Sequence, residues 1–153
     1  DDDHFPLATN DVITVWIPAQ AIPIEMGPLT FAKPIEAYKL VKDVKFCGFD
    51  TSYDREISNV FKTKQISVVE EPFELGEVSF HHNLCFHTAS GNKTNQSRIV
   101  LANTYFGDGA RVVDNPTMIS GDWKKFIPDT DPGEIVSSNL NPICWPVNNQ
   151  VKI

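Results

Sequence analysis

The sequence predicts an all-β domain, built as a sandwich, a barrel or a jelly roll. Three observations lead to this class. Several short segments are rich in β-branched and aromatic residues, glycine and proline separate these segments, and one segment alone has helical periodicity. At 153 residues the chain fits a single domain, 1–153, with room for a sizeable core.

Five segments are expected to form strands, each bounded by turn-forming residues. They are 12–17, 28–31, 66–70, 77–87 and 98–106. The last two give the strongest signal because they are long and rich in valine, isoleucine, phenylalanine and tyrosine.

One short helix is expected at 54–61, where Ile57, Val60 and Phe61 share a face. Thr51 or Ser52 can cap it. From Gly107 onward the chain is rich in proline and is expected to be a long ordered coil. Trp123 and Phe126 are expected to anchor this coil.

Composition and charge exclude several classes of protein. The net charge of −7 repels phosphate backbones, so nucleic acid is not expected as a partner. No apolar run reaches the roughly 18–20 residues that span a bilayer, so no membrane is expected either. Three cysteines without a CxxC pair predict reduced thiols in an intracellular, cytoplasmic protein. The acidic start is unlike a signal peptide, although an upstream targeting segment stays open.

Residues 76–98 contain the most informative pattern. Alternation along the predicted strand 77–87 places one polar set on a single face, formed by Ser79, His81, Asn83, Cys85 and His87. Inside a β-sandwich such a face must line water, a ligand or a metal, because burying unpaired polar groups is costly. The alternative is a solvent-exposed polar face, and this segment alone does not decide between the two.

The same segment resembles the distal iron-binding motif of the phytanoyl-CoA dioxygenase family. In that motif a strand that opens with glycine ends in a histidine, with an asparagine five residues later and an arginine eleven residues later. Gly76, His87, Asn92 and Arg98 stand at these positions.

The N-terminus carries a second similarity to this family. An H-x-D motif, an aromatic–proline pair and a strand with a tryptophan resemble residues 1–6 and 12–18, with Asp1 at the position of the iron-ligating aspartate. The partner histidine would then precede residue 1, so the chain is expected to lack its own N-terminal portion. Residues 26–31 and 123–146 also resemble family segments.

The resemblance implies a double-stranded β-helix (jelly roll), incomplete at its N-terminus, that hydroxylates an unactivated C–H bond of a small organic or acyl substrate. It implies Fe(II) as the metal and 2-oxoglutarate and O₂ as cosubstrates. The implied iron ligands are Asp1 and His87. Two imidazoles and one carboxylate leave three open positions on an octahedral Fe(II).

The other site residues follow from the same resemblance. Arg98 would bind the distal carboxylate of 2-oxoglutarate through its planar guanidinium group. Trp16 would line the same pocket, although a buried tryptophan is more often part of the core. His81 and Asn83 would lie beside the ligands or on the substrate side. His82 and His4 are expected to be structural.

The sequence departs from the family in its loops. Residues 32–36 replace a P-G-S-H turn, and Thr88 and Ala89 stand where the family has glycine and serine. Both changes affect the substrate assignment more than the iron. The alternatives are a halogenase, which the acidic residues 1–3 argue against, a non-catalytic jelly-roll binding protein, and an inactive fragment of an oxygenase.

Overall fold

A computed structural model of the chain describes residues 5–33, 36–45, 51–116 and 122–145. Its elements in chain order are β1 (Val12–Pro18), the 3-10 turn η1 (Ile24–Met26), β2 (Leu29–Ala32), α1 (Ala37–Val41), α2 (Ser52–Thr63), β3 (Val68–Glu70), β4 (Ser79–His82), β5 (His87–Ala89), β6 (Val100–Phe106) and the 3-10 turn η3 (Trp123–Lys125). In this described part, no helix has both the length and the apolar character needed to span a membrane.

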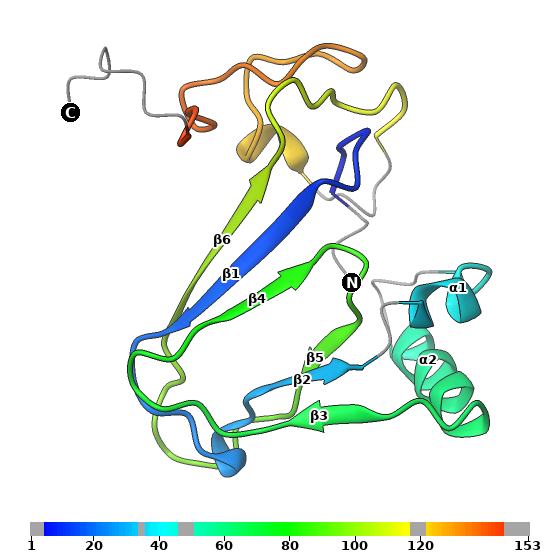
Figure 1. Cartoon of the computed structure of the whole chain (residues 1–153), viewed down its shortest axis with the longest axis vertical. Helices are drawn as coiled ribbons and strands as arrows, with labels where there is room; N and C mark the ends of the chain where they lie inside the picture. Colours follow the sequence, from blue (N-terminus) through cyan, green and yellow to red (C-terminus); the bar gives the residue numbers. More distant parts are fainter. Residues whose placement is uncertain (1–4, 34–35, 46–50, 117–121, 146–153) are drawn as a thin grey trace. The chain divides into compact units, whose positions relative to one another are not determined.

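Two three-stranded sheets dominate the fold (Figure 1). One has the order β4-β1-β6 and the other has the order β3-β2-β5. β1 pairs antiparallel with β4, and β2 pairs antiparallel with both β3 and β5. The predicted strand-rich class is therefore confirmed as two antiparallel sheets with few helices.

The predicted strand 77–87 is wrong as a single element. It divides into β4, in the first sheet, and β5, in the second. A turn separates them, in which the amide of Cys85 donates to the carbonyl of His82 at 2.8 Å and the amide of Leu84 donates to Nδ1 of His82 at 3.2 Å. The turn satisfies these backbone groups locally and carries the chain from one sheet to the other. The predicted strand 98–106 likewise begins later, at Val100.

The predicted helix is confirmed as α2, which extends two residues beyond the predicted end. Ile57 is buried, and Val60 and Phe61 pack against a cluster that includes Phe86. Thr51 occupies the N-cap position without a side-chain cap bond. The sequence did not predict α1, because five residues are too few to show a helical period.

Contacts divide the chain into two compact units. The described residues of unit 1 are 11–33, 36–45 and 51–105, and those of unit 2 are 5–10, 106–116 and 122–145. Unit 1 contains both sheets except for Phe106, the last residue of β6, and it contains two clusters of buried hydrophobic residues. The single domain that the sequence predicts stays a prediction.

Unit 2 is mostly coil, held by isolated bridges between Leu7 and Val112 and between Arg111 and Ile135. Val112 is buried. Phe126, an expected anchor, is 67% exposed, whereas the neighbouring Ile127 is 5% exposed. The expectation that Phe126 anchors the coil is therefore wrong. The amide of Ile127 donates to the carbonyl of Trp123 in the turn η3, and the side chain of Ile127 is the one that is buried.

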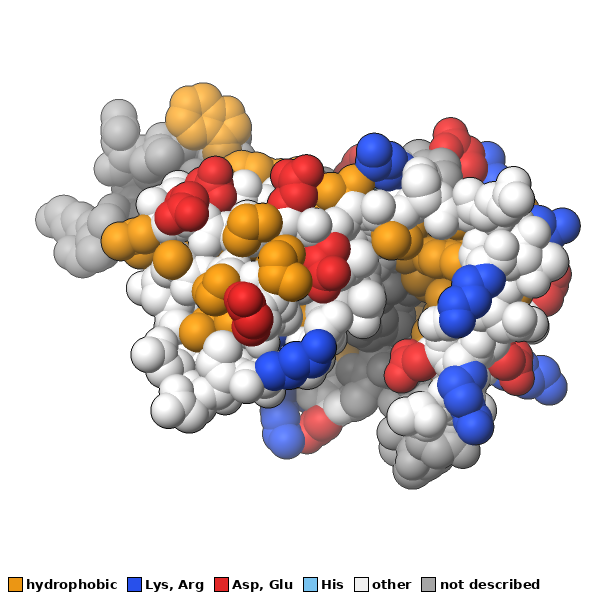
Figure 2. Space-filling model, turned by 90° about the horizontal axis from the view of Figure 1, so that it is seen from below, with side chains coloured by type: hydrophobic (Ala, Val, Ile, Leu, Met, Phe, Trp, Pro, Cys, Tyr) orange, Lys and Arg blue, Asp and Glu red, His pale blue; other side chains and the backbone are white. Residues whose placement is uncertain are grey.

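Seen from below, the surface shows hydrophobic side chains together with acidic and basic ones (Figure 2). The exposed hydrophobic residues include Ile24, Val68 and Leu75.

Candidate active site

The strand registers of unit 1 place polar side chains on the inner face of the first sheet. Thr14 pairs with His81 and Trp16 pairs with Ser79, so these residues share one side of the sheet. Thr14 and His81 are both buried. The hydroxyl groups of Thr14 and Thr104 lie 3.0 Å apart, which adds β6 to the same face. Buried hydroxyl and imidazole groups of this kind are unusual for a sandwich interior.

The second sheet presents a matching face. Phe31 pairs with His87 and Leu29 pairs with Ala89, so all four side chains lie on one side of β2 and β5. The rings of His81 and His87 lie 4.4 Å apart between their centroids, and the rings of Phe31 and His81 lie 5.4 Å apart. Because β4 and β5 belong to different sheets, these rings meet between the sheets. The inter-sheet site is defined here as Thr14, Phe31, Ser79, His81, His87 and Thr104.

His87 is half-buried, and a hydrogen bond to the backbone orients its ring. Its Nδ1 lies 3.0 Å from the carbonyl oxygen of Cys85. A carbonyl only accepts, so Nδ1 carries the proton in a neutral ring and Nε2 is the nitrogen with the lone pair. Metal-binding histidines are commonly held in this way by a backbone carbonyl.

His81 and Asn83 are among the most deeply buried polar residues, at 5% and 3% exposure. The Oδ1 atom of Asn83 and the Oγ atom of Ser79 have no hydrogen-bond partner among the described residues. A buried oxygen without a partner costs about 1–3 kcal/mol, so bound water or ligand groups are expected at these atoms. His82 instead accepts a bond from the amide of Leu84, which is a structural contact.

Arg98 lies ahead of β6 and reaches the chain where η1 meets β2. Its Nη1 donates to the carbonyl of Gly27 and lies 3.4 Å from the carbonyl of Met26. A Cβ atom at Gly27 would lie 3.2 Å from this Nη1 and 2.1 Å from the carbonyl oxygen of Ser90. The backbone therefore holds the guanidinium close to the residue that follows β5.

Trp16 belongs to a buried cluster with Ile22, Met26 and Leu29. Its ring lies 4.9 Å from the ring of Phe73, between centroids. Trp16 therefore packs directly behind two cavity-lining residues, Leu29 and Phe73.

The expected iron ligand Asp1 lies outside the described residues, as does His4, which is expected to be structural. Within the described ranges, no three His, Cys, Asp or Glu side chains are grouped so that they could hold a metal ion. His87 is the predicted iron ligand whose position the structure describes.

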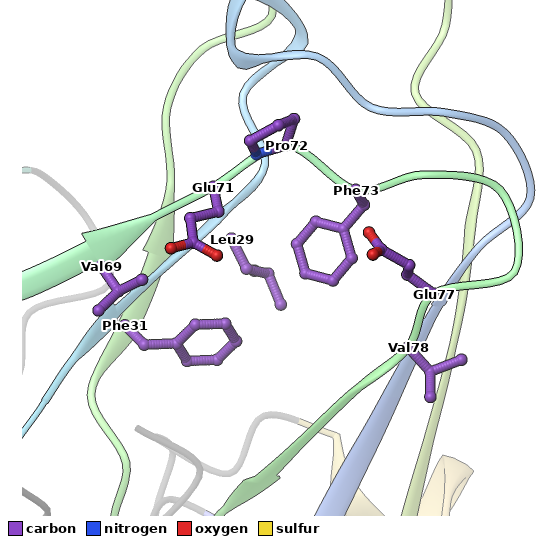
Figure 3. Close-up of a pocket in the computed structure, with 8 residues that line it drawn as sticks. All are labelled: Leu29, Phe31, Val69, Glu71, Pro72, Phe73, Glu77 and Val78. Carbon is purple, nitrogen blue, oxygen red and sulfur yellow. The ribbon is translucent and has the colours of Figure 1, made fainter.

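A cavity of about 400 Å³ opens beside the inter-sheet site (Figure 3). Its walls are largely apolar and include Leu29, Phe31, Val69, Phe73 and Val78. Glu71 and Glu77 also line it, and Figure 3 shows their carboxylates turned toward the side chains of Leu29 and Phe73. A second cavity of about 330 Å³ shares Phe31 and Val69 with the first and is also lined by Ser79, His81 and Cys85.

Sequence reasoning missed several of these residues. Thr14 could have been found, because alternation along 12–17 places it on the face of Val12 and Trp16. Phe31, Phe73 and Glu71 gave no such signal, because their neighbours come from distant parts of the chain.

No protein-family model matches the sequence, and no curated protein does. Several solved structures match the structure of this chain. A non-heme alpha ketoglutarate dependent carbocyclase, SnoK from nogalamycin biosynthesis, is 21% identical, with a TM-score of 0.67 over 92% of this chain and 52% of that one. The chain shares its fold.

The epimerase SnoN from nogalamycin biosynthesis, also non-heme and alpha ketoglutarate dependent, gives 21% identity and a TM-score of 0.62 over 90% of this chain and 49% of that one. SnoN in complex with Fe3+, alpha ketoglutarate and nogalamycin RO gives 22% identity and a TM-score of 0.65 over 92% and 53%. The chain thus spans about half the length of these enzymes.

Proposed function

We propose that the protein is an Fe(II)- and 2-oxoglutarate-dependent oxygenase of the phytanoyl-CoA dioxygenase type, with a jelly-roll catalytic domain. The observation that carries this proposal is the orientation of His87 between the two sheets. Its ring faces His81, and its Nδ1 is held by the carbonyl of Cys85. The iron- and 2-oxoglutarate-dependent neighbours of the same fold support the same reaction class.

The described residues fit iron at His87. The tautomer that the Cys85 carbonyl selects leaves Nε2 to bind a cation, and the surrounding hydroxyl and imidazole groups make the site polar enough to admit one. Asp1 and a histidine upstream of it would complete two imidazoles and one carboxylate, the set that suits non-haem Fe(II). Bound iron and 2-oxoglutarate would supply the power to oxidise an unactivated C–H bond with O₂.

Arg98 fits the distal carboxylate of 2-oxoglutarate. An extended chain advances roughly 10 Å from His87 to Ser90, the residue near the guanidinium of Arg98. This separation between the imidazole and the guanidinium suits a short dicarboxylate. The carbonyl of Gly27 engages Nη1 and orients the guanidinium plane. A planar, oriented fork can bind a carboxylate bidentately.

The remaining residues would hold the small-molecule substrate. Phe31 and the apolar cavity walls would contact the apolar part of a substrate beside His87. His81 and Ser79 can donate hydrogen bonds to a substrate oxygen, because both line the second cavity. These side chains would orient the substrate relative to an iron bound at His87.

The histidine assignment is tested in the natural full-length polypeptide with His87→Ala and, as a matched control, His82→Ala. His87→Ala is expected to abolish Fe(II)-dependent conversion of 2-oxoglutarate to succinate, because one of three protein ligands is lost. His82→Ala is expected to retain it. Unchanged succinate production by His87→Ala would rule out His87 as a ligand.

The arginine assignment is tested with Arg98→Lys and with Arg111→Lys. Arg111 is a matched control because it also donates to a glycine carbonyl, that of Gly133. Losing the fork at Arg98 should raise the KM for 2-oxoglutarate by about 30-fold or more, as expected when a charge-assisted contact of roughly 2 kcal/mol is lost. Equal KM values for the two variants would remove Arg98 from the cosubstrate site. Binding of 2-oxoglutarate without turnover would favour a non-catalytic binding protein.

A further inference from the structure

The larger cavity has the size of a small-molecule site and an unusual combination of lining groups. Its volume of about 400 Å³ lies in the range of cavities that bind small organic ligands. Phe31 and Phe73 give it aromatic walls, and Glu71 and Glu77 give it two carboxylates. Among the described residues that line it, none is basic.

These groups select for charge. Two carboxylates near an apolar cavity create a negative potential that repels anions and attracts cations. Aromatic rings attract the same cations through their faces, and carboxylates together with rings suit an ammonium group in particular. Glu71 and Glu77 are both exposed residues at the rim of the cavity, and Oε2 of Glu77 accepts a bond from the amide of Glu74 at 2.7 Å.

The cavity also leads toward the inter-sheet site. Phe31 and Val69 line both cavities, and the second one continues to Ser79 and His81. The Oγ atom of Ser79 is buried without a hydrogen-bond partner among the described residues, so a polar group of a ligand would satisfy it. A ligand that spans both cavities would therefore meet carboxylates at its outer end and hydrogen-bonding groups at its inner end, next to the ring of His87.

We propose that the substrate is a small molecule with an apolar body and a protonated amine, bound with the amine between Glu71 and Glu77 and with its opposite end beside Ser79 and His81. The identity of this ligand as a substrate rests on the proposed oxygenase function. The binding of the ligand to the two cavities is independent of that function.

The test compares three probes that share a naphthylethyl body and carry a polar head of different charge: the cationic 2-(2-naphthyl)ethylamine, the neutral 2-(2-naphthyl)ethanol and the anionic 3-(2-naphthyl)propanoate. Binding to the full-length protein is followed by fluorescence anisotropy of the naphthyl group, without added iron or 2-oxoglutarate. The amine is expected to bind about ten-fold more tightly than the alcohol, as one well-placed cation contact allows, and the propanoate is expected to bind most weakly.

Variants decide whether the preference comes from this cavity. The double variant E71Q/E77Q should reduce the preference for the amine over the alcohol to less than about three-fold. The double variant E36Q/E56Q removes the same number of charges from exposed positions elsewhere in unit 1 and should leave the preference unchanged. Equal binding of amine and alcohol, binding of none of the probes, or an unchanged preference in E71Q/E77Q would overturn the proposal.

Failure of this proposal and failure of the oxygenase assignment give different results. Amine-selective binding without turnover of 2-oxoglutarate would retain the cavity and reject the reaction. Turnover of 2-oxoglutarate without amine selectivity would retain the reaction and reject the amine as the substrate class.

Discussion

Gly27 connects η1 to β2 with a φ of 73°, and the carbonyl of Ser90 and the guanidinium of Arg98 approach its Cα closely. Glycine adopts this left-handed conformation at little cost, and it alone has no Cβ to collide with its neighbours. A single residue thereby allows β2, the end of β5 and Arg98 to meet. The proposed 2-oxoglutarate site depends on this close approach.

Gly27→Ala should therefore destabilise the protein by at least about 2 kcal/mol, the sum of a strained φ and an overpacked contact. Gly76→Ala is the matched control, since Gly76 also has a positive φ, of 94°, but no atom lies within 4 Å of its Cβ position. That variant should lose about 1 kcal/mol from the conformation alone. Urea unfolding measures both free energies, and equal losses would show that the approach of Ser90 to Gly27 is not tight.

Among the elements, α2 packs on the second sheet through aromatic rings. Phe61 on α2 meets Phe86, which lies just before β5, edge-on, with 5.7 Å between ring centroids. Phe86 is buried and its carbonyl accepts a bond from the amide of Ala32 in β2. The helix therefore supports the segment that leads directly to His87.

A double-mutant cycle with Phe61→Leu and Phe86→Leu should give a coupling energy of about 0.5–1.5 kcal/mol, the range for edge-to-face aromatic pairs. Leucine keeps most of the apolar volume, so the cycle isolates the ring contact. The measurement is urea unfolding of the four proteins. Additive effects would mean that the two rings do not interact in solution.

The same helix carries a tyrosine whose pKa is shifted. Burial, and secondarily the charge of Asp54, raises the pKa of Tyr53 above its ordinary value of 10.0. Below that value both the folded and the unfolded protein hold the proton, so Tyr53 contributes no pH dependence. Above it the unfolded chain loses the proton first, and stability falls.

Tyr53→Phe should therefore make the free energy of unfolding less sensitive to pH above 10.0 and leave that sensitivity unchanged at neutral pH. Tyr38→Phe provides a control, because Tyr38 packs against the same hydrophobic cluster. Urea unfolding across this range gives the comparison. Identical alkaline profiles for the wild-type protein and Tyr53→Phe would contradict the assignment.

At the scale of the whole molecule, the two compact units raise the question of cooperativity. Ile22 is fully buried in unit 1 and Val112 is almost fully buried in unit 2. β6 runs across the boundary between the units, which lies between Tyr105 and Phe106. Because an unbroken strand joins the units, we expect them to unfold together.

Ile22→Ala should cost roughly 2–5 kcal/mol and Val112→Ala roughly 2 kcal/mol, since each leaves a cavity in a packed interior. In a single cooperative domain both variants lower the same thermal transition, which calorimetry resolves as one peak. Two peaks, each shifted by only one of the variants, would show that the units unfold independently and would reject the single-domain prediction.

The sequence by itself determined most of the elements and the spacing of the candidate site. Composition located β1, β2, β3 and β6 to within a few residues, and the period of three to four residues located α2. The resemblance of His87, Asn92 and Arg98 to the family's motif implied an iron and 2-oxoglutarate site, which stays a prediction. These features are local, so neighbouring residues suffice to predict them.

Only the tertiary structure decided how the site is assembled. Alternation placed His81 and His87 on one face of one strand, whereas they lie on facing strands of two sheets and meet across the gap between them. Phe31 contacts His81 from a distant part of the chain, and Arg98 contacts Gly27 across 71 residues of sequence. A strand pattern specifies which side chains alternate, but the partner of each strand is fixed by non-local backbone pairing and by the turn at Asn83, which local periodicity does not encode.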